Sequence, residues 1–119
     1  MSRRLESKLQ ESCFRWFSYS YPEHQGLLFA VPNGGYRDIR TAQTLKKEGV
    51  IAGVSDLILM VPRGKYHALC IEMKVKGNYP TQLQKEWGQK VTMQGYRYEV
   101  VYDFEKFTLL IDSYLKENI

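Results

Sequence analysis

Two apolar runs on either side of a short Pro-Arg-Gly-Lys segment constrain the fold more than any other feature of the sequence. Residues 56–61 and 66–75 each have the length and composition of a strand, and residues 62–65 between them have the composition of a turn. Both runs are apolar on both faces, which is typical of central strands that are covered by helices on each side. The sequence therefore predicts an antiparallel hairpin at the centre of an α/β sheet.

The rest of the chain supplies the helices and the outer strands. Helices are predicted over residues 3–20, 37–48, 81–94 and 104–116, and further strands over residues 27–31 and 96–102. Tyr21-Pro22 ends the first helix, while Gly49 and Gly95 stand in C-terminal cap positions of the second and third. The predicted fold is a mixed central β-sheet flanked by helices.

Size and charge narrow the choice of partners. The 119 residues are enough for one domain with its own core, so a single domain over residues 1–119 is expected. The net charge of +4 fits a nucleic-acid partner, but it fits an ordinary solvated surface equally well. No apolar run approaches the roughly 18 residues that a membrane span needs, and the N-terminus lacks the apolar centre of a signal peptide. A cytoplasmic protein without membrane contact is expected.

Two acids and one lysine on the predicted hairpin are the candidates for chemistry. Side chains alternate along a strand, so Glu72 and Lys74 point to the same face, roughly 6.5 Å apart. Folding the hairpin about residues 62–65 sets Asp56 directly opposite Glu72, with about 5 Å between their β-carbons. Two such carboxylates repel each other unless a cation lies between them, which favours a hard divalent ion, Mg²⁺ or Mn²⁺. The alternative is a Glu72–Lys74 ion pair with Asp56 capping the strand entry.

Four motifs follow one another along the chain: Gly53-Val-Ser-Asp56-Leu, Ile71-Glu72-Met-Lys74, Thr81-Gln-Leu-Gln84-Lys-Glu-Trp87 and Gly95-Tyr96. Their content and order resemble the VRR-NUC domain, the virus-type replication-repair nucleases of the PD-(D/E)xK superfamily. Residues 31–35, Arg37 and residues 6–10 are also similar to that family, so the resemblance covers nearly the whole chain. Ser55 stands where the family usually has a proline, which removes no ligand.

The resemblance implies a restriction-endonuclease-like core and a metal-dependent endonuclease. Its substrate would be branched or flapped DNA, including four-way junctions. The metal ligands implied are Asp56, Glu72 and the Met73 carbonyl, with Lys74 as a catalytic residue. Because the family includes stand-alone phage and prophage members, a phage or bacterial origin is expected. A non-catalytic nucleic-acid-binding module with the same fold is the alternative.

Supporting roles for Glu6 and Gln84 are also implied by the resemblance. Glu6 fits a solvated helix start as well. Gln84 fits a capping box with Thr81, in which its side chain reaches back to the Thr81 amide. The sequence alone leaves these alternatives open.

A third group of residues is predicted to contact DNA. Glycines let a phosphate backbone approach main-chain N–H groups, although Asn-Gly is also the commonest tight turn. The predicted DNA-contacting residues are Asn33, Gly34, Gly35, Arg37, Arg40 and Lys76. A chain of this size covers only part of a branched duplex, so a symmetric homodimer with two active sites is expected.

Overall fold

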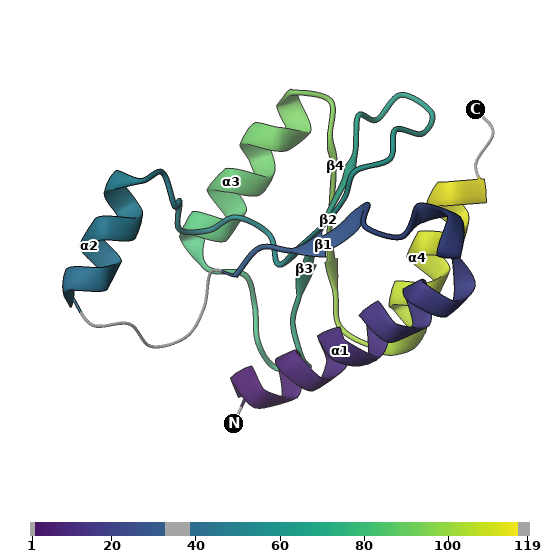
Figure 1. The fold of residues 1–119 in the computed structure, drawn as a ribbon, viewed down its shortest axis with the longest axis horizontal. Coiled ribbons are helices and arrows are strands. Elements are labelled where there is room, and N and C mark those ends of the chain that lie inside the picture. The colour runs from purple at the N-terminus through teal and green to yellow at the C-terminus, as the bar shows by residue number, and fades with distance from the viewer. Residues whose placement is uncertain (1, 33–38, 117–119) are drawn as a thin grey trace.

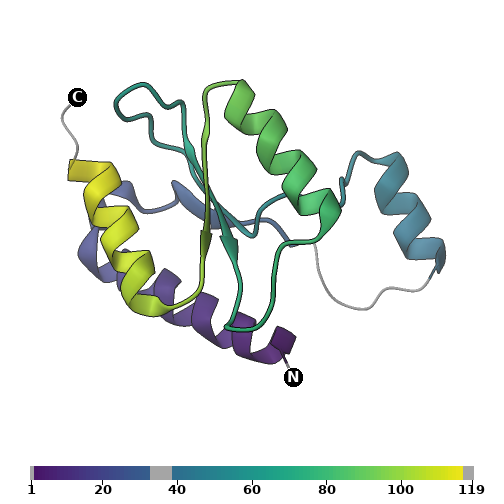
Figure 2. The same cartoon turned by 180° about the vertical axis from the view of Figure 1, so that it is seen from behind.

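The computed structural model describes residues 2–32 and 39–116, which form a four-stranded sheet with helices on both faces (Figures 1 and 2). In chain order the elements are α1 (Ser2–Ser20), the 3-10 helix η1 (Pro22–His24), β1 (Leu28–Ala30), α2 (Ile39–Lys47), β2 (Leu57–Leu59), β3 (Leu69–Met73), α3 (Gln82–Met93), β4 (Arg97–Val101) and α4 (Phe104–Lys116). The predicted order of helices and strands is confirmed. No helix in the described residues is both long and apolar enough to cross a bilayer.

The sheet is mixed, with strand order β1-β2-β3-β4. β1 pairs antiparallel with β2, β2 antiparallel with β3, and β3 parallel with β4. The two central strands are therefore the two apolar runs, as predicted. Strands β2 and β3 are shorter than the two apolar runs, because the β2–β3 ladder ends at Leu59 on one strand and at Leu69 on the other. Between these residues a single isolated bridge pairs Arg63 with Tyr66.

The register of the central hairpin decides where the polar residues lie. Leu57 pairs with Ile71 and Leu59 with Leu69. One step further along this ladder, Asp56 stands opposite Glu72, which is the predicted register. Because side chains alternate, Glu72 points to the opposite face from Ile71.

One face of the sheet holds the hydrophobic core. Ile71 and Leu69 are fully buried there, beneath α1 and α4, which lie side by side across the sheet (Figures 1 and 2). The buried residues that the two helices supply are Cys13, Phe17, Phe107, Ile111, Tyr114 and Leu115. Burial of this apolar surface from both layers stabilises the fold by roughly 25 cal/mol per Å².

The other face of the sheet is covered by α3, which packs closely on β4. Gly88 of α3 lies against the ring of Tyr98, and a β-carbon at Gly88 would stand 2.8 Å from the ring atom Cε2. Trp87 meets the same ring edge-on, with 6.2 Å between ring centroids. Glu72 faces this side of the sheet, so α3 is the helix that can reach it.

Helix α2 stands away from the rest of the molecule (Figures 1 and 2), and none of its residues is buried. It ends at Gly49, which has φ +106°. The Gly49 N–H donates to the Lys46 carbonyl at 3.1 Å, and the Val50 N–H donates to the Leu45 carbonyl at 3.0 Å. These two bonds form a Schellman cap, so the predicted role of Gly49 is confirmed.

Candidate active site

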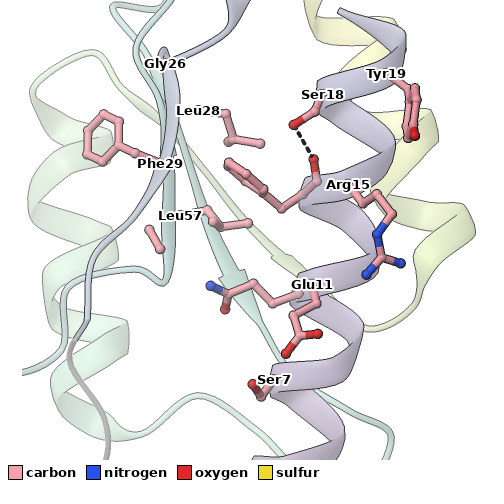
Figure 3. Close-up of a pocket in the computed structure, with 12 residues that line it drawn as sticks. Ser7, Glu11, Arg15, Ser18, Tyr19, Gly26, Leu28, Phe29 and Leu57 are labelled. Carbon is pink, nitrogen blue, oxygen red and sulfur yellow. Dashed lines mark hydrogen bonds between the residues drawn. The ribbon is translucent and has the colours of Figure 1, made fainter.

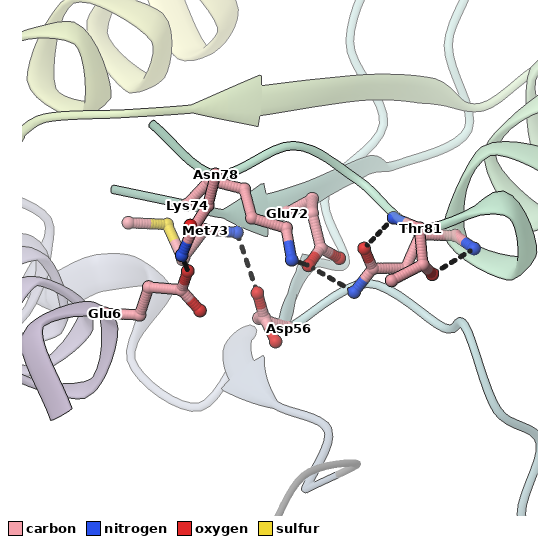
Figure 4. Close-up of polar contacts among 8 residues, drawn as sticks. Glu6, Asp56, Glu72, Met73, Lys74, Asn78 and Thr81 are labelled. Atoms are coloured by element: carbon pink, nitrogen blue, oxygen red, sulfur yellow. Dashed lines mark hydrogen bonds and ion pairs between the residues drawn. The ribbon is translucent and has the colours of Figure 1, made fainter. Parts of the chain in front are cut away.

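Two carboxylates and one ammonium group meet where the β2–β3 hairpin opens (Figure 4). Glu72 is 1% exposed and Lys74 9% exposed. Nζ of Lys74 lies 3.6 Å from Oε2 of Glu72. Oδ2 of Asp56 accepts a hydrogen bond of 2.7 Å from the Met73 N–H, which places the Met73 backbone beside the same site. The residues that strand alternation and hairpin register predict to meet therefore lie together.

The two oxygens of Glu72 have different surroundings. Oε2 accepts a hydrogen bond of 2.8 Å from Nε2 of Gln84 and faces Lys74. Oε1 is buried and accepts no hydrogen bond from any residue in the described part of the chain. An unsatisfied buried polar atom costs about 1–3 kcal/mol, and more when it is charged. A proton or a cation would satisfy this oxygen.

The donor set fits a hard divalent ion. Within residues 2–32 and 39–116 no group of three or more His, Cys, Asp and Glu side chains gathers to hold a metal. The residues that line the site include the carboxylates of Asp56 and Glu72, with that of Glu6 nearby, and no cysteine or histidine among those described. Mg²⁺ and Mn²⁺ accept such a set because they keep several waters and take phosphate oxygens as further ligands.

The pKa values of Asp56 and Glu72 are both raised in the folded protein. Burial raises the pKa of Glu72 to about 8; the nearby Asp56 adds to that rise, and Lys74 opposes it. Burial also raises the pKa of Asp56. The hydrogen bond from the Met73 N–H opposes this rise, because it favours the charged form of the Asp56 carboxylate. Without a cation the two acids therefore share a proton near neutral pH, with Glu72 as its main holder.

Gln84 joins helix α3 to Glu72. Its Oε1 accepts a 2.8 Å hydrogen bond from the Thr81 N–H, and its main-chain N–H donates to Oγ1 of Thr81 at 3.2 Å, which completes the predicted capping box. Its Nε2 simultaneously donates to Glu72. The predicted cap is therefore confirmed, and the amide nitrogen of the same side chain also holds the carboxylate, while a supporting role in catalysis stays a prediction.

Replacing Gln84 with alanine is expected to destabilise the protein by about 1–2 kcal/mol, since one change removes both a helix cap and a buried hydrogen bond. Urea unfolding measures this difference. Gln82→Ala is the matched control, because Gln82 lies on the same helix and bonds only to the exposed Glu86. Equal stability of the two variants would contradict the double role of Gln84.

Glu6 reaches the site from α1. Its Oε2 accepts a hydrogen bond of 3.1 Å from Nδ2 of Asn78, which lies in the loop after β3. Its negative charge contributes to the raised pKa of Asp56, so Glu6 belongs to the surroundings of the pair. Asn78 had no signal in the sequence, because its partner is 72 positions away and a loop asparagine usually indicates only a turn.

The three charged groups line a cavity of about 580 Å³ between α1 and the start of α3. Its lining residues include Arg3, Glu6, Ser7, Gln10, Gly53, Asp56, Glu72, Lys74, Thr81 and Gln84. A larger pocket of about 900 Å³ lies between α1 and β1, and Figure 3 shows that Phe29 and Leu28 belong to its walls. None of the predicted site residues lines that pocket, so chemistry and not volume identifies the smaller cavity as the candidate active site.

The predicted DNA-contacting residues are spread more widely. Asn33, Gly34, Gly35 and Arg37 lie outside the described residues. Arg40 is exposed on α2, and Lys76 is exposed in the turn that follows β3. Neither lines the candidate cavity, so any contact they made with DNA would lie outside it.

A glycine holds one wall of the cavity in place. Gly53 has φ +95°, and a β-carbon there would stand 2.7 Å from the Leu83 carbonyl oxygen. Only glycine combines this backbone conformation with so close an approach to α3. The loop that carries Gly53 leads directly to Asp56.

Gly53→Ala is expected to cost about 2–4 kcal/mol, from backbone strain and a clash together. Gly77 also has φ +95°, but nothing lies within 4 Å of its β-carbon position. Gly77→Ala therefore measures the strain alone. Thermal unfolding of both variants checks the prediction, and equal melting temperatures would contradict the close packing of Gly53 on α3.

Comparisons with known proteins bear on the family and the fold. A family model described as the VRR-NUC domain matches residues 4–104. A solved structure described as a VRR_NUC domain protein is similar with a TM-score of 0.79 and 29% identity, covering 93% of this chain and 88% of the other. A second, described as a VRR_NUC domain, has a TM-score of 0.55 and 21% identity, covers 87% and 95%, and shares the fold. A search of curated proteins found no match.

Proposed function

Because the chain belongs to the VRR-NUC domain family, which is of nuclease type, we propose that it is a metal-dependent endonuclease that hydrolyses phosphodiester bonds in branched or flapped DNA. One observation carries this proposal. The half-buried Asp56 is opposed to the buried Glu72, and an oxygen of Glu72 accepts no hydrogen bond from the described residues. Such a pair is costly for folding, and its cost is removed by the divalent ion that phosphodiester hydrolysis uses.

The roles of the residues follow from their positions. Asp56 and Glu72, with the Met73 carbonyl, would hold Mg²⁺ or Mn²⁺. When bound, such an ion supplies Lewis-acid activation of the attacking water and neutralises charge on the phosphate. Lys74, nearly buried beside Glu72, provides a fixed positive charge that orients the phosphate and stabilises the negative charge that develops on it.

Two further residues keep the carboxylates in position. Gln84 donates a hydrogen bond to Oε2 of Glu72 and so fixes the orientation of the carboxylate. Glu6 adds a negative charge on the side of α1, where Asn78 restrains it. We assign both a supporting role, because their contacts lie around the carboxylate pair.

The proposed substrate preference rests on the size of the cavity and on the basic residues outside it. The cavity of about 580 Å³ accepts a phosphate and its neighbouring sugars, but it offers little surface for reading base sequence. Selection by DNA shape is therefore the proposed mode, with Arg40 and Lys76 as contacts outside the cavity. A symmetric homodimer would bring a second active site to a second strand of a junction.

Cleavage assays test the proposal directly. Purified protein is incubated with flap, splayed-arm and four-way junction DNA in Mg²⁺ or in EDTA, and RNA substrates are run alongside. The expected result is Mg²⁺-dependent cutting of branched DNA that leaves 5′-phosphates. If the wild type and Glu72→Gln shift the DNA equally and neither cuts it, the chain is a binding module and the proposal is wrong.

A further inference from the structure

Helix α2 lacks the packing that keeps a short helix folded. None of its nine residues is buried, and Ile39 at its start is 75% exposed. In both views the helix stands apart from the sheet and its flanking helices (Figures 1 and 2). Helices shorter than about 12 residues are marginal in water. A partner surface is therefore needed to hold α2 in place.

The charge of α2 indicates what that partner is. The helix carries Arg40, Lys46 and Lys47 and no acidic residue, although Glu48 follows directly after it. Neither Arg40 nor Lys47 forms an ion pair within the part of the chain that the structure describes. They lie seven residues apart, so both point from the same face of the helix, about 10 Å apart along its axis. Two cations on one helix face complement a polyanion.

The position of α2 connects it to the catalytic cavity. The loop after the helix reaches Gly53, which packs against Leu83 in the cavity wall. Gly53 is six positions after Lys47, so Lys47 lies within about 20 Å of that wall. One turn of B-DNA spans about 34 Å. A duplex whose phosphate enters the cavity therefore passes within reach of α2.

We propose that α2 is a DNA-binding arm, whose Arg40 and Lys47 hold the phosphate backbone of a duplex arm beside the scissile phosphate. This inference rests on the proposed function and adds to it a surface, helix α2, that binds the DNA outside the cavity. The arm acts on affinity, because its cations do not touch the carboxylate pair. Loss of the arm therefore weakens binding.

The test is a double variant, Arg40→Ala/Lys47→Ala, since alanine preserves helix propensity. Binding to a fluorescent flap duplex is measured by anisotropy in EDTA over a range of salt concentrations. Loss of two phosphate contacts is expected to reduce the slope of log K against log salt by about 2 and to weaken binding on the order of tenfold. Lys106→Ala/Lys116→Ala removes the same charge from exposed positions on α4 and is the control.

The outcomes separate this inference from the proposed function. If the α2 variant and the control bind with the same affinity and salt slope, α2 is not a DNA-binding arm, whether or not the wild type cuts. If the wild type binds DNA and the α2 variant binds less well, the inference holds even when no cutting is seen. If the wild type sediments as a dimer and the α2 variant as a monomer, α2 pairs two copies of the chain, and the proposal is wrong.

Discussion

Glu72→Gln is expected to abolish cleavage and, at the same time, to raise the melting temperature of the metal-free protein at alkaline pH. Cleavage should fall by about a thousandfold or more, since a metal ligand worth several kcal/mol in the transition state is lost. The stability gain has a separate cause. Glutamine keeps the shape of the side chain but removes the charge that Asp56 opposes.

The raised pKa of Glu72 determines how the stability of the folded protein changes with pH. Glu72 has a pKa of about 8 in the folded protein against an ordinary value of 4.5. The folded state therefore binds a proton that the unfolded chain releases, and stability falls as pH rises from about 4.5 to about 8. At about 1.4 kcal/mol per pKa unit the loss amounts to a few kcal/mol. Glutamine does not titrate, so the variant should escape this loss.

Thermal unfolding in EDTA between pH 5 and pH 9 measures the effect. The wild type should melt at a progressively lower temperature across this range, while Glu72→Gln should follow a flatter curve and melt higher at pH 9. Glu99→Gln is the matched control, because Glu99 lies on the neighbouring strand with a side chain 39% exposed. A Glu72→Gln curve parallel to that of the wild type would contradict the opposed-carboxylate account.

Lys74→Met is expected to lower kcat by about a hundredfold to a thousandfold and to leave metal binding intact. Methionine fills the space of the lysine stem but removes the positive charge that faces Glu72 at 3.6 Å. In the proposed mechanism this charge stabilises the transition state and does not hold the ion. Mg²⁺ should therefore still raise the melting temperature of the variant.

The two variants together distinguish the proposed metal ligand, Glu72, from the proposed catalytic residue, Lys74. Mg²⁺ should stabilise Lys74→Met but not Glu72→Gln, as thermal unfolding with and without the ion will show. Lys85→Met, at an exposed position on α3, controls for the change of residue type. Wild-type cleavage by Lys74→Met would remove Lys74 from the mechanism.

The central hairpin could be predicted in detail because its determinants are local. Alternation of side chains and the position of the turn decide which residues face each other, and the register of Leu57 with Ile71 follows from both. That register brings Asp56 opposite Glu72 without any knowledge of the rest of the fold. The mixed sheet and its flanking helices also follow from the order of periodic segments.

Contacts between distant segments could not be predicted in the same way. Gln84 caps its own helix by a local rule, but its bond to Glu72 depends on how closely α3 approaches β3. The hydrogen bond from Asn78 to Glu6 joins the loop after β3 to helix α1, two segments that no sequence pattern pairs. The exposure of α2 is a further example, because periodicity indicates a helix but not the surface on which it packs.

Anomalous diffraction from crystals soaked in Mn²⁺ tests the central claim most directly. The account predicts a peak between the carboxylates of Asp56 and Glu72, which should disappear in Glu72→Gln crystals treated in the same way. No peak between these two side chains at saturating Mn²⁺, or a peak bound only elsewhere in the molecule, would contradict it.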